Sequence, residues 1–153
     1  MAAQMSGATL ASRLIDGLYT EAMLLADETR GYFEGEGVAE REALPPRERV
    51  DFACEALKGT TRLMHVIAWL LVRRAISEGE LEPGDAAAPQ RRLGETPPLD
   101  LDALAGLPEP ARRLLSQGAD LYERVRRLDE GSIVPTAIAS PALSLIQRLE
   151  RSF

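Results

Sequence analysis

Apolar residues in the middle of the chain fall on two regular stripes. The first stripe consists of Val50, Cys54, Leu57, Thr61, Met64, Ala68, Leu71 and Ala75, and the second of Phe52, Ala56, Gly59, Leu63, Val66 and Leu70. Both alternate steps of three and four residues, which is the spacing of a heptad seam on an α-helix. Pro46 suits a first helical turn and Gly79 suits a helix end, so the pattern predicts one helix over about residues 46–77.

This predicted helix has apolar side chains on two nearly opposite faces. An offset of two residues separates the stripes by about 160° around the helix axis, so both sides need a cover. A third line, Lys58, Arg62, His65, Trp69, Val72 and Ile76, changes from charged to apolar along the helix. Two interpretations stay open: a protein contact centred on Trp69, or the long loop after the helix folding back over it. The candidate dimer or partner interface consists of Leu63, Val66, Trp69, Leu70 and Val72.

Two further long helices are predicted, one on either side of the central helix. The first covers about residues 9–34, with Thr9 as its N-cap, and the third covers about residues 108–128. The short connection 35–45 leaves room for a helical turn near Ala39–Leu44 and suits an antiparallel hairpin. The loop over 78–107 is unusually long for a compact domain, and its Asp100 is a candidate cap for a helical turn at 101–105.

We therefore predict an all-α fold, a three-helix bundle of long antiparallel helices over residues 1–130 that forms a dimer. Each long helix carries an interior glycine, namely Gly17, Gly59 and Gly118. A helical glycine costs about 1 kcal/mol relative to alanine, so we expect close helix crossings at these positions as compensation.

The last segment, residues 131–153, is predicted to be a tail with a short amphipathic helix over 141–152. Ser140 and Pro141 resemble a cap and a first-turn proline. The candidate tail contact is one face of this helix, formed by Leu143, Ile146, Leu149 and Phe153. Because so short a helix is marginal alone, it docks on the bundle, docks on a partner or stays mostly unfolded.

Composition excludes several functional classes. The net charge of −6 argues against nucleic-acid binding, which depends on neutralising phosphates, and no apolar run is long enough for a membrane span. A single cysteine excludes an intramolecular disulfide, and the N-terminus lacks the pattern of a secretory signal, so we expect a cytoplasmic protein. His65 is the only histidine, about 16 Å along the helix from Cys54, so we predict no catalytic, cofactor-binding or metal-binding residue.

Three stretches resemble the alphaproteobacterial RcdA family, whose name stands for regulator of CtrA degradation. They are LYTEAMLLADETRGYF at 18–33, RVDFACEALKGTTRLMHVIAWLLVRRA at 49–75 and SQGADLYERVRRLDE at 116–130. The resemblance covers about residues 9–130 and rests on extended similarity, because the family has no catalytic motif to match. It implies a dimeric three-helix bundle followed by a flexible C-terminal tail.

The resemblance also implies a function. It predicts a non-enzymatic adaptor that delivers cell-cycle regulators to the ClpXP protease, within a hierarchy that includes a response-regulator-type adaptor and a cyclic-di-GMP-binding adaptor. Recruitment to the cell pole by such partners is left open. The alternatives are a helical bundle that binds a small molecule or metal in its core, and a homodimeric regulatory domain with unrelated partners. A DNA-binding role fits the acidic charge least.

Overall fold

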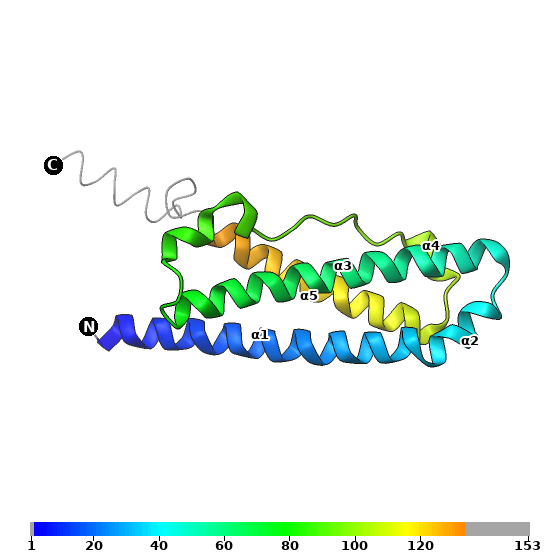
Figure 1. Cartoon of the computed structure of the whole chain (residues 1–153), viewed down its shortest axis with the longest axis horizontal. Helices are drawn as coiled ribbons and strands as arrows, with labels where there is room; N and C mark the ends of the chain where they lie inside the picture. The colour runs from blue at the N-terminus through cyan, green and yellow to red at the C-terminus, as the bar shows by residue number, and fades with distance from the viewer. Residues whose placement is uncertain (1, 134–153) are drawn as a thin grey trace.

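A computed structural model describes residues 2–133, and within that range every regular element is a helix. Figure 1 shows three long helices lying alongside one another. The long helices are α1 (Ala2–Glu34), α3 (Pro46–Ser77) and α5 (Glu109–Ile133); the short ones are α2 (Glu36–Glu42), α4 (Leu101–Ala105) and the 3₁₀ turns η1 (Pro83–Ala87) and η2 (Pro89–Arg91). The predicted all-α bundle is confirmed.

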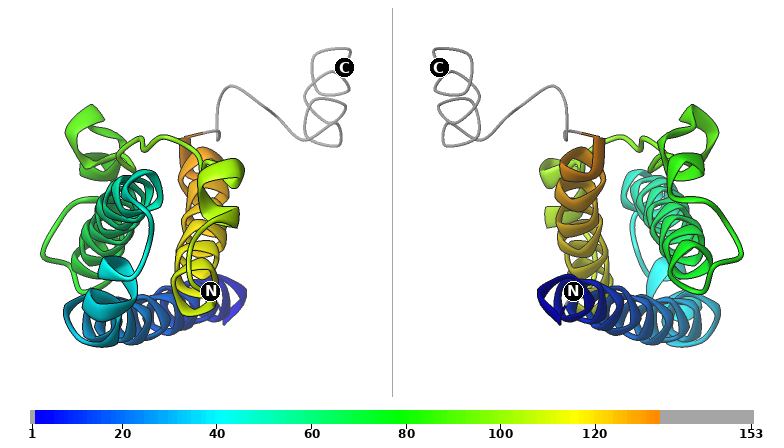
Figure 2. Two further views of the ribbon diagram at one scale, coloured as in Figure 1. Left: turned by 90° about the vertical axis from the view of Figure 1, so that its right-hand side faces the viewer. Right: turned by 90° about the vertical axis from the view of Figure 1, so that its left-hand side faces the viewer.

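Seen along the bundle, α3 and α5 lie on opposite sides and α1 runs across beneath both of them (Figure 2). Helix α1 packs against both α3 and α5, and α3 packs against α5. Helix α3 runs antiparallel to α1, as the short connection predicts, but α5 runs parallel to α3 (Figure 1). The physical reason is the segment 78–100, which returns along the length of the bundle before α5 begins.

The core is built from one stripe of each long helix. On α3 it is the second stripe that turns inward, with Phe52, Leu63, Val66 and Leu70 all buried. Helix α1 contributes Leu18, Ala22, Leu25 and Tyr32, and α5 contributes Ala111, Leu114, Leu115, Leu121 and Val125. At one end of the bundle, the ring of Phe33 meets the rings of Tyr32 and Phe52 edge-on, with centroids 5.0 and 5.2 Å away.

Element bounds differ from the prediction mainly at the chain ends and in the connections. Helix α3 has the expected range, whereas α1 begins at Ala2 instead of near Thr9, and α5 continues to Ile133. The connection 35–45 contains α2, and the 78–107 loop contains η1, η2 and α4. Asp100 caps α4 as expected, since its carboxylate accepts hydrogen bonds from the backbone N–H groups of Asp102 and Ala103 at 3.1 Å.

The interior glycines are explained by close packing at one position only. A Cβ at Gly59 would lie 2.5 Å from Cδ2 of Leu115, so α3 and α5 approach closely there, as predicted. A Cβ at Gly118 would make only an ordinary contact at 3.9 Å, and one at Gly17 would meet nothing within 4 Å. The expectation of a close crossing at Gly17 is therefore wrong, because that side of α1 faces open space.

Candidate interaction surface

A segment that we call the strap, residues 92–100, lies along the third line of α3. The ammonium group of Lys58 donates to the carbonyl oxygen of Pro98 at 3.5 Å, and the guanidinium of Arg62 donates to that of Pro97 at 2.7 Å. From the other side, the hydroxyl of Tyr122 on α5 donates to the carbonyl oxygen of Gly94 at 2.8 Å. Side chains of two helices thus hold the backbone of the strap in place.

One end of the strap is fixed by a buried carboxylate, Asp129 on α5. Its oxygens accept hydrogen bonds from the Trp69 indole N–H at 2.8 Å, from the Arg92 guanidinium at 3.1–3.4 Å and from the backbone N–H of Leu93 at 3.4 Å. The guanidinium of Arg73 stacks 4.5 Å from the Trp69 ring centroid. The strap therefore covers the line that contains Trp69, and of the two interpretations the loop cover is the one that the structure supports.

The candidate interface residues are buried or half-buried, not exposed as the sequence pattern suggested. Leu63, Val66, Trp69 and Leu70 are each at most 5% exposed, and Val72 is half-buried. These four side chains belong to the chain's own core, because α1, α5 and the strap already cover them. They are not accessible to a partner in this conformation, and any partner surface on α3 has to be sought on another face.

Two charged side chains are buried beneath the strap. Arg62 is 2% exposed, and burial lowers its pKa, while the nearby charge of Glu55 opposes that shift. Glu55 is also buried and pairs with Lys58 at 2.6 Å. Nη1 of Arg62 and Oε2 of Glu55 have no hydrogen-bond partner. Arg62, Lys58 and Glu55 together carry a net charge of +1, and the bonds of both cations to strap carbonyl oxygens support a structural role beneath the strap.

The surface that remains exposed on α3 is its first apolar stripe, which we call the α3 outer stripe. Its large members are Val50, Leu57, Met64 and Leu71, which are 62%, 69%, 63% and 47% exposed. Small residues, Cys54, Thr61 and Ala68, alternate with them. Such alternation lets a neighbouring helix approach closely. The interface expected from the sequence, however, did not include this stripe.

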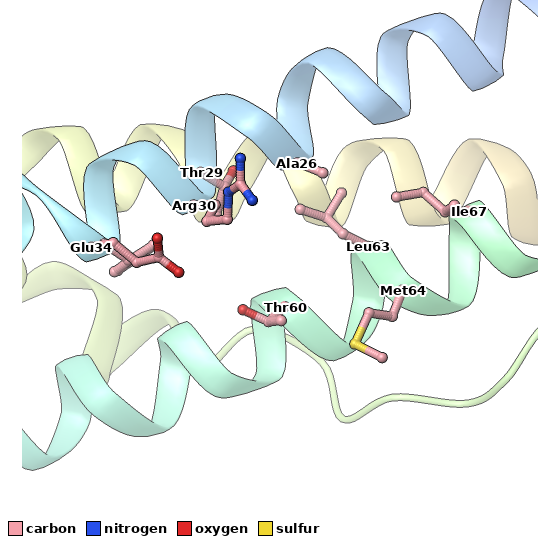
Figure 3. Close-up of a pocket in the computed structure, with 9 residues that line it drawn as sticks. Ala26, Thr29, Arg30, Glu34, Thr60, Leu63, Met64 and Ile67 are labelled. Atoms are coloured by element: carbon pink, nitrogen blue, oxygen red, sulfur yellow. The ribbon is translucent and has the colours of Figure 1, made fainter.

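A groove between α1 and α3 borders the α3 outer stripe. We call it the α1–α3 groove; it encloses about 320 Å³ and is lined by Ala26, Thr29, Arg30, Phe33, Glu34, Thr60, Leu63, Met64 and Ile67. Figure 3 shows side chains of both helices facing this space. Most of the lining is apolar, with Arg30 and Glu34 contributed by α1. The sequence pattern does not reveal this groove, because the groove depends on how two helices pack.

His65 and Cys54 behave as structural or surface residues. The ring of His65 packs against Gly94 of the strap so tightly that a Cβ there would lie 2.6 Å from its Nδ1. Cys54 is exposed on the α3 outer stripe, not buried as a core stripe would require. Between residues 2 and 133, no group of three or more His, Cys, Asp or Glu residues is placed to hold a metal ion.

Two further sequence predictions concern the membrane and the tail. Within the described range, none of the helices combines the length and the apolar character that crossing a membrane would require. The candidate tail contact, Leu143, Ile146, Leu149 and Phe153, lies outside the described residues. The structure therefore leaves the three possible states of the tail open.

Comparison with known proteins relates the chain to a protein family and to the solved structure of a similar protein. The model of a family described as "Protein of unknown function (DUF1465)" matches residues 6–153. The crystal structure of RcdA from Caulobacter crescentus CB15 is 36% identical in sequence, with a TM-score of 0.68. The match covers 82% of this chain and 97% of the RcdA chain. Curated protein sequences give no significant match.

Proposed function

Because the chain belongs to the DUF1465 family and is related to RcdA over most of its length, we propose that it is a non-enzymatic protein-interaction adaptor. In this role the bundle is a rigid support that presents apolar helix surfaces to other proteins. The process that we propose for it is regulated proteolysis, with delivery of cell-cycle regulators to the ClpXP protease. Its further partners would be a response-regulator-type adaptor and a cyclic-di-GMP-binding adaptor.

The observation that carries this proposal is the exposure of the α3 outer stripe. Val50, Leu57 and Met64 are each more than 60% exposed and lie one heptad apart, so they form a continuous apolar seam. A row of this kind is costly to leave in water and is typical of a protein-binding surface. The stripe therefore supports docking of a partner helix, and a second copy of the chain is the first such partner that we propose.

A reconstituted degradation assay tests the adaptor role. Purified ClpXP, the two upstream adaptors and a candidate client regulator are mixed with the full chain, and loss of the client is followed over time. The variant carrying Leu57→Glu and Met64→Glu places two charges on the α3 outer stripe. We expect it to slow client degradation at least tenfold, because charges in an apolar seam abolish helix docking.

The matched control carries Leu24→Glu and Leu101→Glu. These leucines are 67% and 72% exposed, so the control makes the same chemical change at equally exposed positions outside the stripe. It should leave degradation unchanged. Equal loss of activity in both variants would contradict the assignment of the stripe, and no stimulation by the unmodified chain with any client tested would contradict the adaptor role itself.

A further inference from the structure

Helices α3 and α5 hold the strap in the way that a binding site holds an extended peptide. Residues 93–100 form no helix or strand, and Figure 1 shows them as an extended segment along the bundle. The side chains of Lys58, Arg62 and Tyr122 all donate hydrogen bonds to backbone carbonyl oxygens of this segment. Because every residue has a carbonyl group, these contacts do not depend on the side chains of the strap. The cleft between α3 and α5 can therefore hold an extended segment of another sequence.

The side chains of the strap that turn toward the bundle recur at every third residue. Leu93 is buried, Thr96 and Leu99 are half-buried, and Pro97 and Pro98 between the last two are exposed. Three residues per turn is the period of a polyproline II helix, which uses none of its carbonyl groups internally. A site that donates hydrogen bonds to such carbonyls fits a proline-rich segment in this conformation.

The strap leaves polar groups and space unused beneath it. Nη1 of Arg62 and Oγ1 of Thr96 are buried and have no hydrogen-bond partner among the described residues. Both residues line a pocket of about 400 Å³ between the strap, α3 and α5. Glu55 pairs with Lys58 at 2.6 Å, so the positive charge of Arg62 is left over in this cluster. A buried polar group without a partner costs free energy, and the strap is therefore not the best ligand that the cleft can hold.

We propose that the cleft between α3 and α5 binds an extended, proline-rich segment of a partner protein that carries an acidic residue directly before two prolines, and that the strap occupies the cleft until this segment replaces it. The acidic side chain takes the place of Thr96 and pairs with Nη1 of Arg62, since a bond between a guanidinium and a carboxylate is stronger than one between neutral groups. The acidic residues that already line the pocket do not fill this role, because Glu123 pairs with Arg126 at 2.9 Å and Glu95 is exposed.

The partner segment has to compete with a strap that is tethered to the same cleft. A tether gives the strap an effective concentration of about the millimolar range, and any weakening of the strap raises the apparent affinity for a free segment. Gly94 is a suitable point for such weakening, because a Cβ there would lie 2.6 Å from Nδ1 of His65. Use of the cleft by a client or by another adaptor rests on the proposed adaptor function, whereas binding of the segment itself does not.

Fluorescence anisotropy of a labelled peptide measures this binding to the full chain. The probe is the strap sequence of residues 92–100, RLGETPPLD, with glutamate in place of its threonine. Gly94→Ala weakens the strap without a change of charge, and we expect it to bind the probe about tenfold more tightly than the wild type does. Gly84→Ala is the matched control in the same connection, because a Cβ there meets nothing within 4 Å, and it should bind as the wild type does.

Further changes separate specific recognition from adhesion of the peptide. Tyr122→Phe, added to Gly94→Ala, removes one donor to the probe and should weaken binding about threefold, while Tyr19→Phe on α1 should leave it unchanged. A probe that keeps the threonine should bind about threefold more weakly, because it lacks the carboxylate for Arg62. A probe with glycines in place of both prolines should bind about tenfold more weakly, because it is not held in the extended conformation beforehand.

Nuclear magnetic resonance of the isotope-labelled wild type, titrated with unlabelled probe to millimolar concentration, needs no variant. Release of the strap should move the amide signals of Glu95 and Thr96 toward random-coil positions and leave those of Ala26 and Thr29 on α1 in place. Strap signals that stay unchanged would overturn the proposal even if Gly94→Ala fails to fold. Equal binding of the glycine probe, or binding that Tyr122→Phe does not weaken, would overturn it as well. Because no protease or adaptor is present, none of these failures affects the outcome of the degradation assay.

Discussion

At the residue scale, Tyr32 joins α1 to α2 and should make stability sensitive to alkaline pH. Its hydroxyl donates to Glu40, and burial together with that carboxylate raises the pKa of Tyr32 above its ordinary value of 10.0. A raised pKa means that the folded state holds the phenol proton more tightly than the unfolded state. The stabilising contribution is therefore complete below about pH 10 and is lost as the pH rises through the folded-state pKa.

The test compares the wild type with Tyr32→Phe in urea unfolding from pH 8 to pH 11. We expect the difference in free energy of unfolding to be constant up to about pH 10 and then to shift in favour of the variant, since phenylalanine does not ionise. Both proteins lose other contributions at high pH, so only the difference is informative. If the two curves remain parallel throughout, Tyr32 is not the group responsible.

Two interior glycines, also at the residue scale, should respond in opposite ways to alanine. Gly17→Ala adds a methyl group in open space and should stabilise α1 by up to about 1 kcal/mol through helix propensity. Gly59→Ala should bring no gain, because the new Cβ would lie 2.5 Å from Cδ2 of Leu115 in the core and force it to move. Urea unfolding of both variants measures this contrast, and an equal gain at both positions would contradict the close crossing of α3 and α5.

At the scale of elements, Asp129 joins the strap to α3 and α5. One carboxylate accepts hydrogen bonds from α3 through Trp69 and from the strap through Arg92 and Leu93. Asp129→Asn removes the charge that compensates these buried donors. We expect a loss of about 3 kcal/mol, the lower end of the cost of breaking a buried ion pair, and faster hydrogen exchange in the strap.

Asp120→Asn is the matched control for this substitution. Asp120 lies on the same helix but is exposed, so its replacement should change stability by less than about 0.5 kcal/mol. A small effect of Asp129→Asn, similar to the control, would mean that the strap is held by its contacts to Lys58, Arg62 and Tyr122 alone.

The elements that the sequence predicted well are those with a strong local signal. The heptad steps between Pro46 and Gly79 predict α3, and Asp100 predicts α4 because it is a typical N-cap residue. Helix α2 was predicted only as a helical turn near residues 39–44, because its seven residues carry no helical period of their own and rely on the contact between Tyr32 and Glu40. The parallel course of α5 depends on where the 78–100 segment runs, which local pattern does not encode.

At the scale of the whole molecule, local sequence pattern also does not identify which surface of α3 is exposed. The sequence contained both stripes of α3, but nothing in their spacing indicates which one α1 and α5 bury. The stripe with Leu63, Val66 and Leu70 is buried because Gly59 on that face allows α5 to approach. Trp69 looked like an interface residue because its partner, Asp129, is 60 positions away in the sequence.

The last prediction concerns the oligomeric state of the whole molecule. If the α3 outer stripe pairs two copies, the full chain should sediment at twice the 16.7 kDa mass of one chain. Val50→Glu with Leu57→Glu would then give a folded monomer, because both side chains are more than 60% exposed and their replacement leaves the core intact. Unchanged helical circular dichroism would confirm folding of the variant.

Leu24→Glu with Leu101→Glu again serves as the control, and it should remain dimeric. A wild-type chain that sediments as a monomer at all concentrations would contradict pairing through the stripe. It would leave the stripe free for a different protein, and then the capture of partner proteins by the wild type should fail with Val50→Glu and Leu57→Glu even though no dimer is lost. The two measurements together thus separate self-association from partner binding on one and the same helix face.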